Sequence, residues 1–153
     1  MTILVRAATK DDRAFIEALG KRTAMDSVSS LRRAQPADVL ANFERLLSVV
    51  ALRDHVALIA EAEGVPAGFL LMLDSLPDEV TGDDQAFVVY MAVENAARRT
   101  GVGSALLARA EDEARKRGAP YMALMVTQEN AAARALYERA GYRTERRLLC
   151  KTL

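Results

Sequence analysis

The sequence predicts a mixed α/β (α+β) fold, and three observations carry that prediction. Two apolar segments of strand type, residues 55–62 and 67–73, flank a short turn and predict an antiparallel hairpin in the middle of the chain. Beyond residue 85, apolar strand segments alternate with amphipathic helical segments, which is typical of a sheet covered by helices. The chain has 153 residues and is 51% hydrophobic, enough to bury a core without disulfides or metal. We therefore expect one domain that spans residues 1–153.

The first third of the chain is expected to hold one strand and two helices. Residues 3–6 are apolar and strand-like. Thr9 is expected to cap the first helix, because Asp12 follows it three residues on, as in a capping box. Gly20 is expected to end that helix. A second helix is expected to begin at Pro36, which suits a first turn, and the segment between the two helices is ambiguous.

The rest of the chain alternates strands with helices around one polar loop. Gly118 and Gly141 each follow a helical segment and predict its C-terminal end. The expected elements are a turn at 63–66, an acidic loop at 74–85, strands at 86–93, 121–126 and 142–149, and helices at 104–117 and 131–140.

Composition excludes several classes of function. No stretch approaches the roughly 20 apolar residues of a membrane helix, and the first residues do not read as a secretory leader. We therefore expect a cytoplasmic protein with no membrane partner. Cys150 is the one cysteine and there is one histidine, so disulfides and Cys/His metal sites are excluded for a single chain. The formal net charge is zero, which argues against a dedicated nucleic-acid binder.

The charges are nevertheless unevenly distributed. Residues 54–97 contain nine acidic residues and no lysine or arginine, whereas residues 98–153 contain twelve basic residues and six acidic ones. Such runs are usually solvated surface. The alternative is that one half meets an anionic ligand and the other half a cationic one.

The segment from Arg98 to Ser104 predicts a site for a phosphate-bearing ligand. It follows an apolar strand, contains Gly101 and Gly103, and opens an amphipathic helix. The glycines let the chain turn with its N–H groups inward, and a helix N-terminus adds about half a positive charge. Arg98 and Arg99 add full charges that suit phosphate oxygens.

Two better-known phosphate loops do not match this segment. A P-loop needs Gly-Lys followed by Ser or Thr after a strand, and Gly20-Lys21-Arg22 is the one Gly-Lys in the chain. A dinucleotide fingerprint needs Gly or Ala at its third glycine position, where this chain has Leu106. The remaining pattern is Arg98-x-x-Gly101-x-Gly103, whose structural alternative is an ordinary tight turn at a helix start.

A second segment raises the probability of a ligand site. The strand at 121–126 leads to Asn130 and then to a helix that carries Tyr137. Asn130 suits a helix cap as well as a ligand contact. Tyr137 shares a helix face with small alanines, which suits core packing as well as catalysis.

Together the two segments resemble the GCN5-related N-acetyltransferase (GNAT) superfamily. Arg98-Arg99-Thr100-Gly101-Val102-Gly103 resembles its Gln/Arg-x-x-Gly-x-Gly/Ala pyrophosphate loop, and Asn130 through Tyr142 resembles its second acetyl-CoA motif. Residues 5–12 resemble its usual opening. The resemblance implies a mixed, mostly antiparallel sheet of six to seven strands, flanked by about four helices. Strands four and five would be splayed to admit the pantetheine arm.

The resemblance also implies the roles of individual residues. Acetyl-CoA would be the cosubstrate, no metal would be needed, and the acceptor would be a primary amine on a small molecule or a peptide. Tyr137 would be the general acid that protonates the departing thiolate. The residues implied to bind the cofactor are Met91, Ala92, Val93, Arg98, Arg99, Thr100, Gly101, Val102, Gly103, Ser104, Asn130 and Tyr137.

One departure from the family leaves the general base open. Some members carry a glutamate where this chain has Phe87 and Met125, and neither residue can take a proton. The base is then a water chain or one of Glu61, Glu63 and Asp74, or the amine arrives neutral.

Two other functions stay open at this point. A non-catalytic acyl-CoA-binding module or sensor is favoured by the missing carboxylate base. A nucleotide-binding protein would prefer ATP or NAD to CoA. The sequence identifies neither the amine acceptor nor an interface, although homodimers are common among the proteins that it resembles.

Overall fold

The computed structural model describes residues 1–153, and its strands form one five-stranded sheet in the order β1-β2-β3-β4-β5. Neighbouring strands are antiparallel except β4 and β5, which are parallel. No helix is both long and apolar enough to span a bilayer. The strands are β1 (Ile3–Ala7), β2 (His55–Ala62), β3 (Val65–Leu73), β4 (Ala86–Val93) and β5 (Met122–Leu124). The α-helices are α1 (Arg13–Thr23), α2 (Pro36–Ala51), α3 (Val102–Lys116) and α4 (Ala131–Arg139), and the 3-10 helices are η1 (Lys10–Asp12), η2 (Ala24–Ser27) and η3 (Asn95–Ala97).

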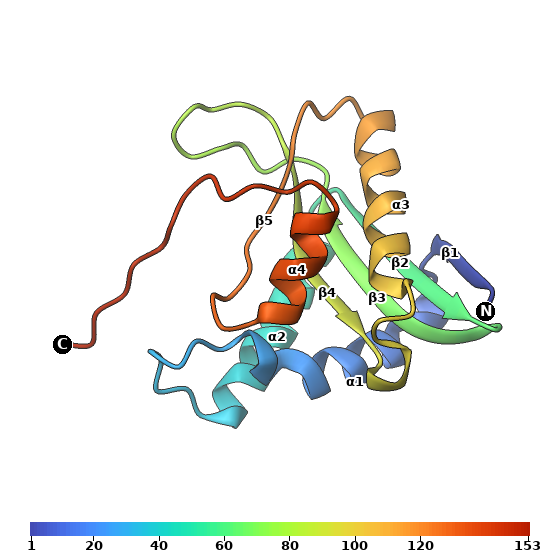
Figure 1. Cartoon of the computed structure of the whole chain (residues 1–153), viewed down its shortest axis with the longest axis horizontal. Coiled ribbons are helices and arrows are strands. Elements are labelled where there is room, and N and C mark those ends of the chain that lie inside the picture. Colours follow the sequence, from blue (N-terminus) through green and yellow to red (C-terminus); the bar gives the residue numbers. More distant parts are fainter.

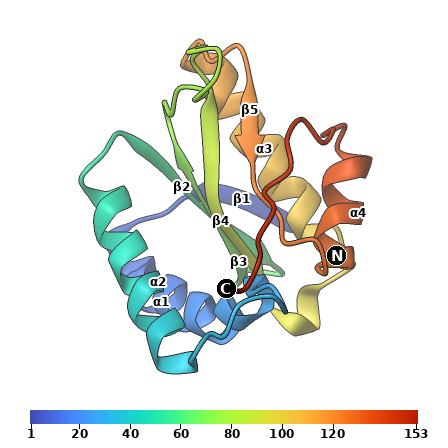
Figure 2. The ribbon, with the colours of Figure 1, turned by 90° about the vertical axis from the view of Figure 1, so that its left-hand side faces the viewer.

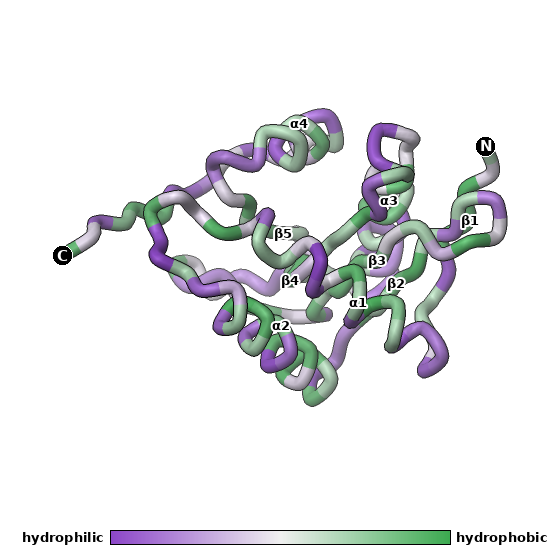
Figure 3. The backbone as a smooth tube through the Cα atoms, turned by 90° about the horizontal axis from the view of Figure 1, so that it is seen from below, coloured by the Kyte–Doolittle hydropathy of each residue, from purple (hydrophilic) through white to green (hydrophobic).

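The helices cover the two faces of the sheet in pairs. Helices α3 and α4 lie on one face, and α1 and α2 on the other (Figures 1 and 2). The view from below shows the strands between these two layers (Figure 3). Each face has its own core. Leu106 and Leu107 of α3 pack on one face, and Leu19 of α1 with Phe43 of α2 packs on the other.

The expected capping box is confirmed and belongs to a larger ionic cluster. The Thr9 amide donates to Asp12 Oδ2 at 2.7 Å, and the Asp11 amide donates to the Thr9 hydroxyl. The Arg6 guanidinium makes two further bonds to the Asp12 carboxylate, and its Nε bonds Glu61 on β2 at 2.7 Å. Asp12 is buried, so this cluster fixes the start of α1 against the first two strands.

Gly20 does not end its helix, contrary to the expectation. Helix α1 continues to Thr23, and Gly20 lies inside it. A Cβ on Gly20 would lie only 1.9 Å from Cζ of Phe43. The glycine is therefore a contact point where the ring from α2 reaches the α1 backbone, and a local breaker signal could not reveal that distant partner.

The central hairpin forms as expected. Glu63 and Gly64 join β2 to β3 with φ angles of +51° and +79°. Two successive positive φ values describe a type I′ turn, whose twist matches that of the flanking strands. The expected strand at 67–73 extends back to Val65.

Strand β4 contains an irregularity that separates it from β5. Leu71 pairs with Tyr90 but Met72 pairs with Val88, so Val89 is an extra residue on β4. The pairing of β4 with β5 covers only Ala86–Val88 against Met122–Leu124. Beyond the bulge, residues 89–93 have β3 on one side and no strand on the other. The expected splay of strands four and five is therefore present.

The expected strand at 142–149 is wrong, and the sheet has five strands rather than six or seven. After α4 the chain runs away from the sheet without regular structure (Figure 1). No amide beyond Tyr142 donates to a backbone carbonyl, while Leu148 and Leu149 are more than 80% exposed. Leu148 and Leu149 suggested a strand, but a strand also needs a neighbouring strand to pair its backbone groups. The three residues of β5 are too few to pair with the tail.

The ion cluster around Asp12 predicts a pH-dependent stability. Hydrogen bonds from Arg6 lower the pKa of Asp12 from 3.8 to about 2, against the opposing effect of burial. Because the folded-state pKa is the lower one, this contribution is present above about pH 4 and is lost as the pH falls toward 2. Asp12→Asn should lower the free energy of unfolding by about 2 kcal/mol at pH 7.

The measurement is urea unfolding of both proteins between pH 2.5 and 7. The stability difference should shrink steadily below pH 4. Asp11→Asn is the matched control, because Asp11 is exposed and its carboxylate makes no ion pair. A difference that stays constant down to pH 2.5 would contradict this account.

Candidate functional site

The Arg98–Ser104 loop turns sharply between η3 and α3. Arg99 has φ +60° and Gly101 has φ +96°, so two left-handed residues lie two positions apart. Gly101 is the cap of α3, which begins at Val102, two residues earlier than predicted. Thr100 fixes the turn, because its hydroxyl donates to the Ala97 carbonyl at 2.6 Å. The left-handed conformation explains why position 101 carries glycine.

Six consecutive amide groups in this loop have no partner in the protein. None of the N–H groups from Arg99 to Ser104 donates a hydrogen bond. The Val102 side chain is buried in the core on one side of the helix start, whereas Arg99, Thr100 and Ser104 are exposed on the other. Free amides at a helix N-terminus, beside two arginines, are typical of a site for an anion. We call residues 98–104 the anion loop.

The edge of β4 beyond the bulge supplies a second set of backbone groups, which no neighbouring strand pairs. The Glu94 amide donates to the Ala67 carbonyl at 2.8 Å, so Glu94 and, by alternation, Ala92 face β3. Met91 and Val93 therefore present their N–H and C=O groups to the side where β5 has diverged. Before the bulge the alternation is reversed, since the Ala86 amide donates toward β5, to the Tyr121 carbonyl.

Gly103 brings the loop, α4 and β4 together. A Cβ at this position would lie 3.0 Å from Cδ2 of Leu136 on α4 and 3.9 Å from Cε of Met91. The absence of a side chain therefore lets α3 approach α4 closely, beside the free edge of β4. Two residues predicted from the sequence, Gly103 and Met91, therefore lie close together here, beside Leu136 of α4.

Arg98 is folded back over the end of β4. Its Nε lies 3.4 Å from the Val93 carbonyl oxygen, and its Nη2 lies 3.3 Å from Oδ2 of Asp26 on η2. Arg98 and Arg99 are both exposed. The guanidinium of Arg98 therefore lies between the free strand edge and the segment that joins α1 to α2.

Asn130 caps α4, which was the simpler of its two expected roles. Its Oδ1 accepts a hydrogen bond from the Ala133 amide at 3.2 Å. The side-chain NH₂ makes no hydrogen bond within the protein and is free to donate to a ligand. A capping role and a ligand contact are therefore compatible at this residue.

Tyr137 lies on α4, half-buried against the core that α3 forms with the sheet. Its ring meets that of Tyr142 edge-on, with centroids 6.1 Å apart. Burial raises the pKa of Tyr137, so its hydroxyl is protonated at neutral pH. That hydroxyl makes no hydrogen bond within the protein, whereas the Tyr142 hydroxyl donates to Glu111 at 3.2 Å.

The candidate bases occupy separate places. Phe87 lies on β4 before the bulge, and Met125 follows β5 with 77% of its surface exposed. Glu61 pairs with Arg6, and Asp74 pairs with Arg117 at the end of α3 opposite to the anion loop. Glu63 is at the hairpin turn, where it accepts from the Thr2 amide.

Sequence reasoning missed a polar group beneath this site. The hydroxyls of Thr23 and Tyr90 lie 2.9 Å apart, and the Tyr90 hydroxyl donates to the Gly20 carbonyl. Asp26 is the nearby carboxylate that holds Arg98. Thr23 ends α1 and Asp26 lies on η2, in the stretch that the sequence pattern left ambiguous, and no periodicity could have indicated their proximity to β4.

A model of the Acetyltransferase (GNAT) family matches residues 24–142. The chain is 42% identical to mycothiol acetyltransferase of Beutenbergia cavernae over 67 residues. These residues make up 44% of this chain and 21% of that protein. It is 44% identical to [ribosomal protein bS18]-alanine N-acetyltransferase of Escherichia coli K12 over 59 residues. These residues make up 39% of this chain and 40% of that protein. The matched segments thus cover less than half the length of either curated relative.

Solved structures share the whole fold at lower identity. An acetyl transferase from Pyrococcus furiosus superposes with a TM-score of 0.83 at 23% identity, over 99% of this chain and all of that one. An aminoglycoside N-acetyltransferase in complex with CoA superposes with a TM-score of 0.73 at 21% identity, over 99% and 95% of the two chains. The family model covers both the anion loop and the segment from Asn130 to Tyr142, and more than half of the chain. The chain therefore belongs to the acetyltransferase (GNAT) family.

Proposed function

We propose that this protein is an acetyl-CoA-dependent N-acetyltransferase that moves the acetyl group to a primary amine. The observation that carries the proposal is the junction of six free amides at the start of α3 with the free edge of β4. A ligand that fits both has an anionic group at one end and an amide-rich arm at the other. Acyl-CoA has both, in its diphosphate and its pantetheine.

The binding roles follow from that arrangement. Residues 98–104 hold the diphosphate through their amides and arginines. Met91 and Val93 hydrogen-bond the amides of the pantetheine as a neighbouring strand would, while Ala92 packs beneath them. Asn130 donates its free side-chain NH₂ to the cofactor. The CoA complex of the structural neighbour supports this choice of cofactor.

The reaction needs no covalent enzyme intermediate. The amine attacks the thioester carbonyl, and a fixed N–H on β4, at Met91 or nearby, stabilises the oxyanion. The C–S bond then breaks, and Tyr137 protonates the thiolate. The surplus proton on the amine leaves through water, because Glu61 and Asp74 are held in ion pairs with arginines.

The acceptor is a small-molecule or peptide amine. The two curated relatives are named for very different acceptors, mycothiol in one case and a ribosomal-protein alanine in the other. Because these two names differ in the acceptor, they do not identify the acceptor of this chain. The acceptor is to be identified by CoA release with a panel of primary amines.

The left-handed glycine of the anion loop predicts a specific loss of cofactor binding. Gly101→Ala places a Cβ on a residue with φ +96°, which costs about 1 kcal/mol and turns the amides out of register. CoA affinity, measured by calorimetry, should fall at least tenfold. Gly118→Ala is the matched control, because Gly118 has φ +80° at the other end of α3. An equal loss of CoA affinity in both variants would contradict the assignment.

The general-acid role predicts a loss of turnover without loss of binding. Tyr137→Phe removes only the hydroxyl, so the rate of CoA release with a panel of primary amines should fall about 100-fold or more. CoA affinity should be unchanged. Tyr142→Phe serves as the control, because its hydroxyl bonds Glu111 instead, and it should keep its activity. A wild-type protein that binds acetyl-CoA and acetylates no amine would support the sensor function.

A further inference from the structure

Arg98 is shared between two groups at the candidate site. One is the Val93 carbonyl, which belongs to the free edge of β4. The other is the carboxylate of Asp26, on η2. Both contacts are long, at 3.4 and 3.3 Å, and both Arg98 and Asp26 are about half exposed. A contact of this kind contributes little stability and is easily exchanged for a stronger one.

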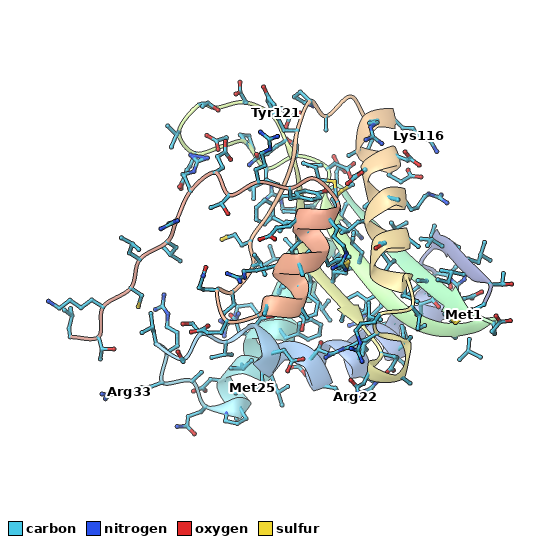
Figure 4. The ribbon with its side chains drawn as sticks, in the orientation of Figure 1. Met1, Arg22, Met25, Arg33, Lys116 and Tyr121 are labelled. Carbon is cyan, nitrogen blue, oxygen red and sulfur yellow. The ribbon has the colours of Figure 1, made fainter.

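Asp26 lies at the rim of the gap on the face that α1 and α2 cover. Figure 4 labels Arg22 and Met25, which lie on either side of the turn from α1 into η2. The same segment touches the β5–α4 loop, since the Thr127 hydroxyl donates to the Ser27 carbonyl at 2.5 Å. Burial raises the pKa of Tyr90 on β4, and the charge of Asp26 raises it further. The same segment reaches the middle of β4, because the hydroxyl of Thr23, three residues before Asp26, lies 2.9 Å from the Tyr90 hydroxyl.

The other carboxylates at this rim already have partners. Glu94 forms an ion pair with Arg22. Glu129 accepts hydrogen bonds from the Ser30 hydroxyl, at 2.7 Å, and from the Ser30 amide. Asp26 has Arg98 alone. Removal of Arg98 would therefore leave one unpaired negative charge facing the gap.

We propose that Asp26 is the recognition site for the ammonium group of the acceptor, and that it becomes available when the cofactor diphosphate takes Arg98 away. This inference rests on the proposed function. A diphosphate offers Arg98 more charge, and a bidentate geometry, than the single contact with Asp26. Cofactor binding thus frees the Val93 carbonyl and the Asp26 carboxylate in one movement, so that amine and cofactor bind cooperatively.

The first test measures competition for Arg98. Calorimetry compares CoA with pantetheine, which lacks the diphosphate, on the wild-type protein and on Asp26→Asn. Asp26→Asn should bind CoA about two- to fivefold more tightly and pantetheine unchanged. Asp38→Asn is the matched control, because Asp38 is exposed and unpaired, and it should match the wild type. Equal CoA affinity in Asp26→Asn and wild type, or a gain for pantetheine too, would overturn the inference.

The second test measures recognition of the amine directly. Butylamine binding is followed by NMR titration with and without saturating CoA, and butanol serves as the neutral analogue. The wild-type protein should bind butylamine at least threefold more tightly when CoA is present, with no such change for butanol. By linkage, the same factor should appear in CoA affinity when butylamine is added.

Two variants make the second test decisive. Asp26→Asn should lose the dependence of butylamine binding on CoA, and Arg98→Gln should bind butylamine tightly even without CoA. Persistence of the dependence in Asp26→Asn, or its absence in the wild type, would overturn the inference. A wild-type protein that does not bind CoA at all would instead contradict the proposed function.

Discussion

The extra residue at Val89 determines the geometry of the candidate site. Up to Val88 the strand presents its outward backbone groups to β5, and the two strands pair. The insertion reverses the alternation, so that Met91 and Val93, rather than Tyr90 and Ala92, face outward. At the same point the two strands separate. One inserted residue therefore creates both the gap and the free backbone groups that line it.

The anion loop depends on the same strand, because it follows directly from its end. Val102 and Leu106 are fully buried and anchor the first turns of α3 in the core. Gly101 takes the left-handed conformation at the start of this helix, and the amides from Arg99 to Ser104 make no hydrogen bond within the protein. Gly103 then permits the close contact with Leu136 that places α4 alongside. The loop is thus rigidly held by apolar packing while its polar groups remain available.

Features with local causes could be predicted from the sequence, whereas those that depend on distant partners could not. The capping box at Thr9, the turn at Glu63 and the glycine loop at 98–104 follow from short-range chemistry, and all three are present as turns or caps. The role of Gly20 depends on Phe43 in another helix. The bulge at Val89 leaves no signature in an apolar strand. The predicted strand at 142–149 does not form, because apolar residues favour a strand but do not provide the neighbouring strand with which it must pair.

The charge distribution shows the same limit most clearly. The acidic run at residues 54–97 suggested a region that attracts cations, but four of its nine carboxylates form ion pairs with arginines from other segments: Glu61 with Arg6, Asp74 with Arg117, Asp78 with Arg146 and Glu94 with Arg22. The carboxylate that is held most weakly at the gap is Asp26, which lies outside that acidic run. An excess of acidic residues along the sequence therefore does not show where negative charge remains unpaired in the folded protein, because folding brings several of these residues next to arginines. The proposed recognition of the amine by Asp26 therefore depends on its partner Arg98, which lies beside six free amides where a diphosphate would bind it more strongly.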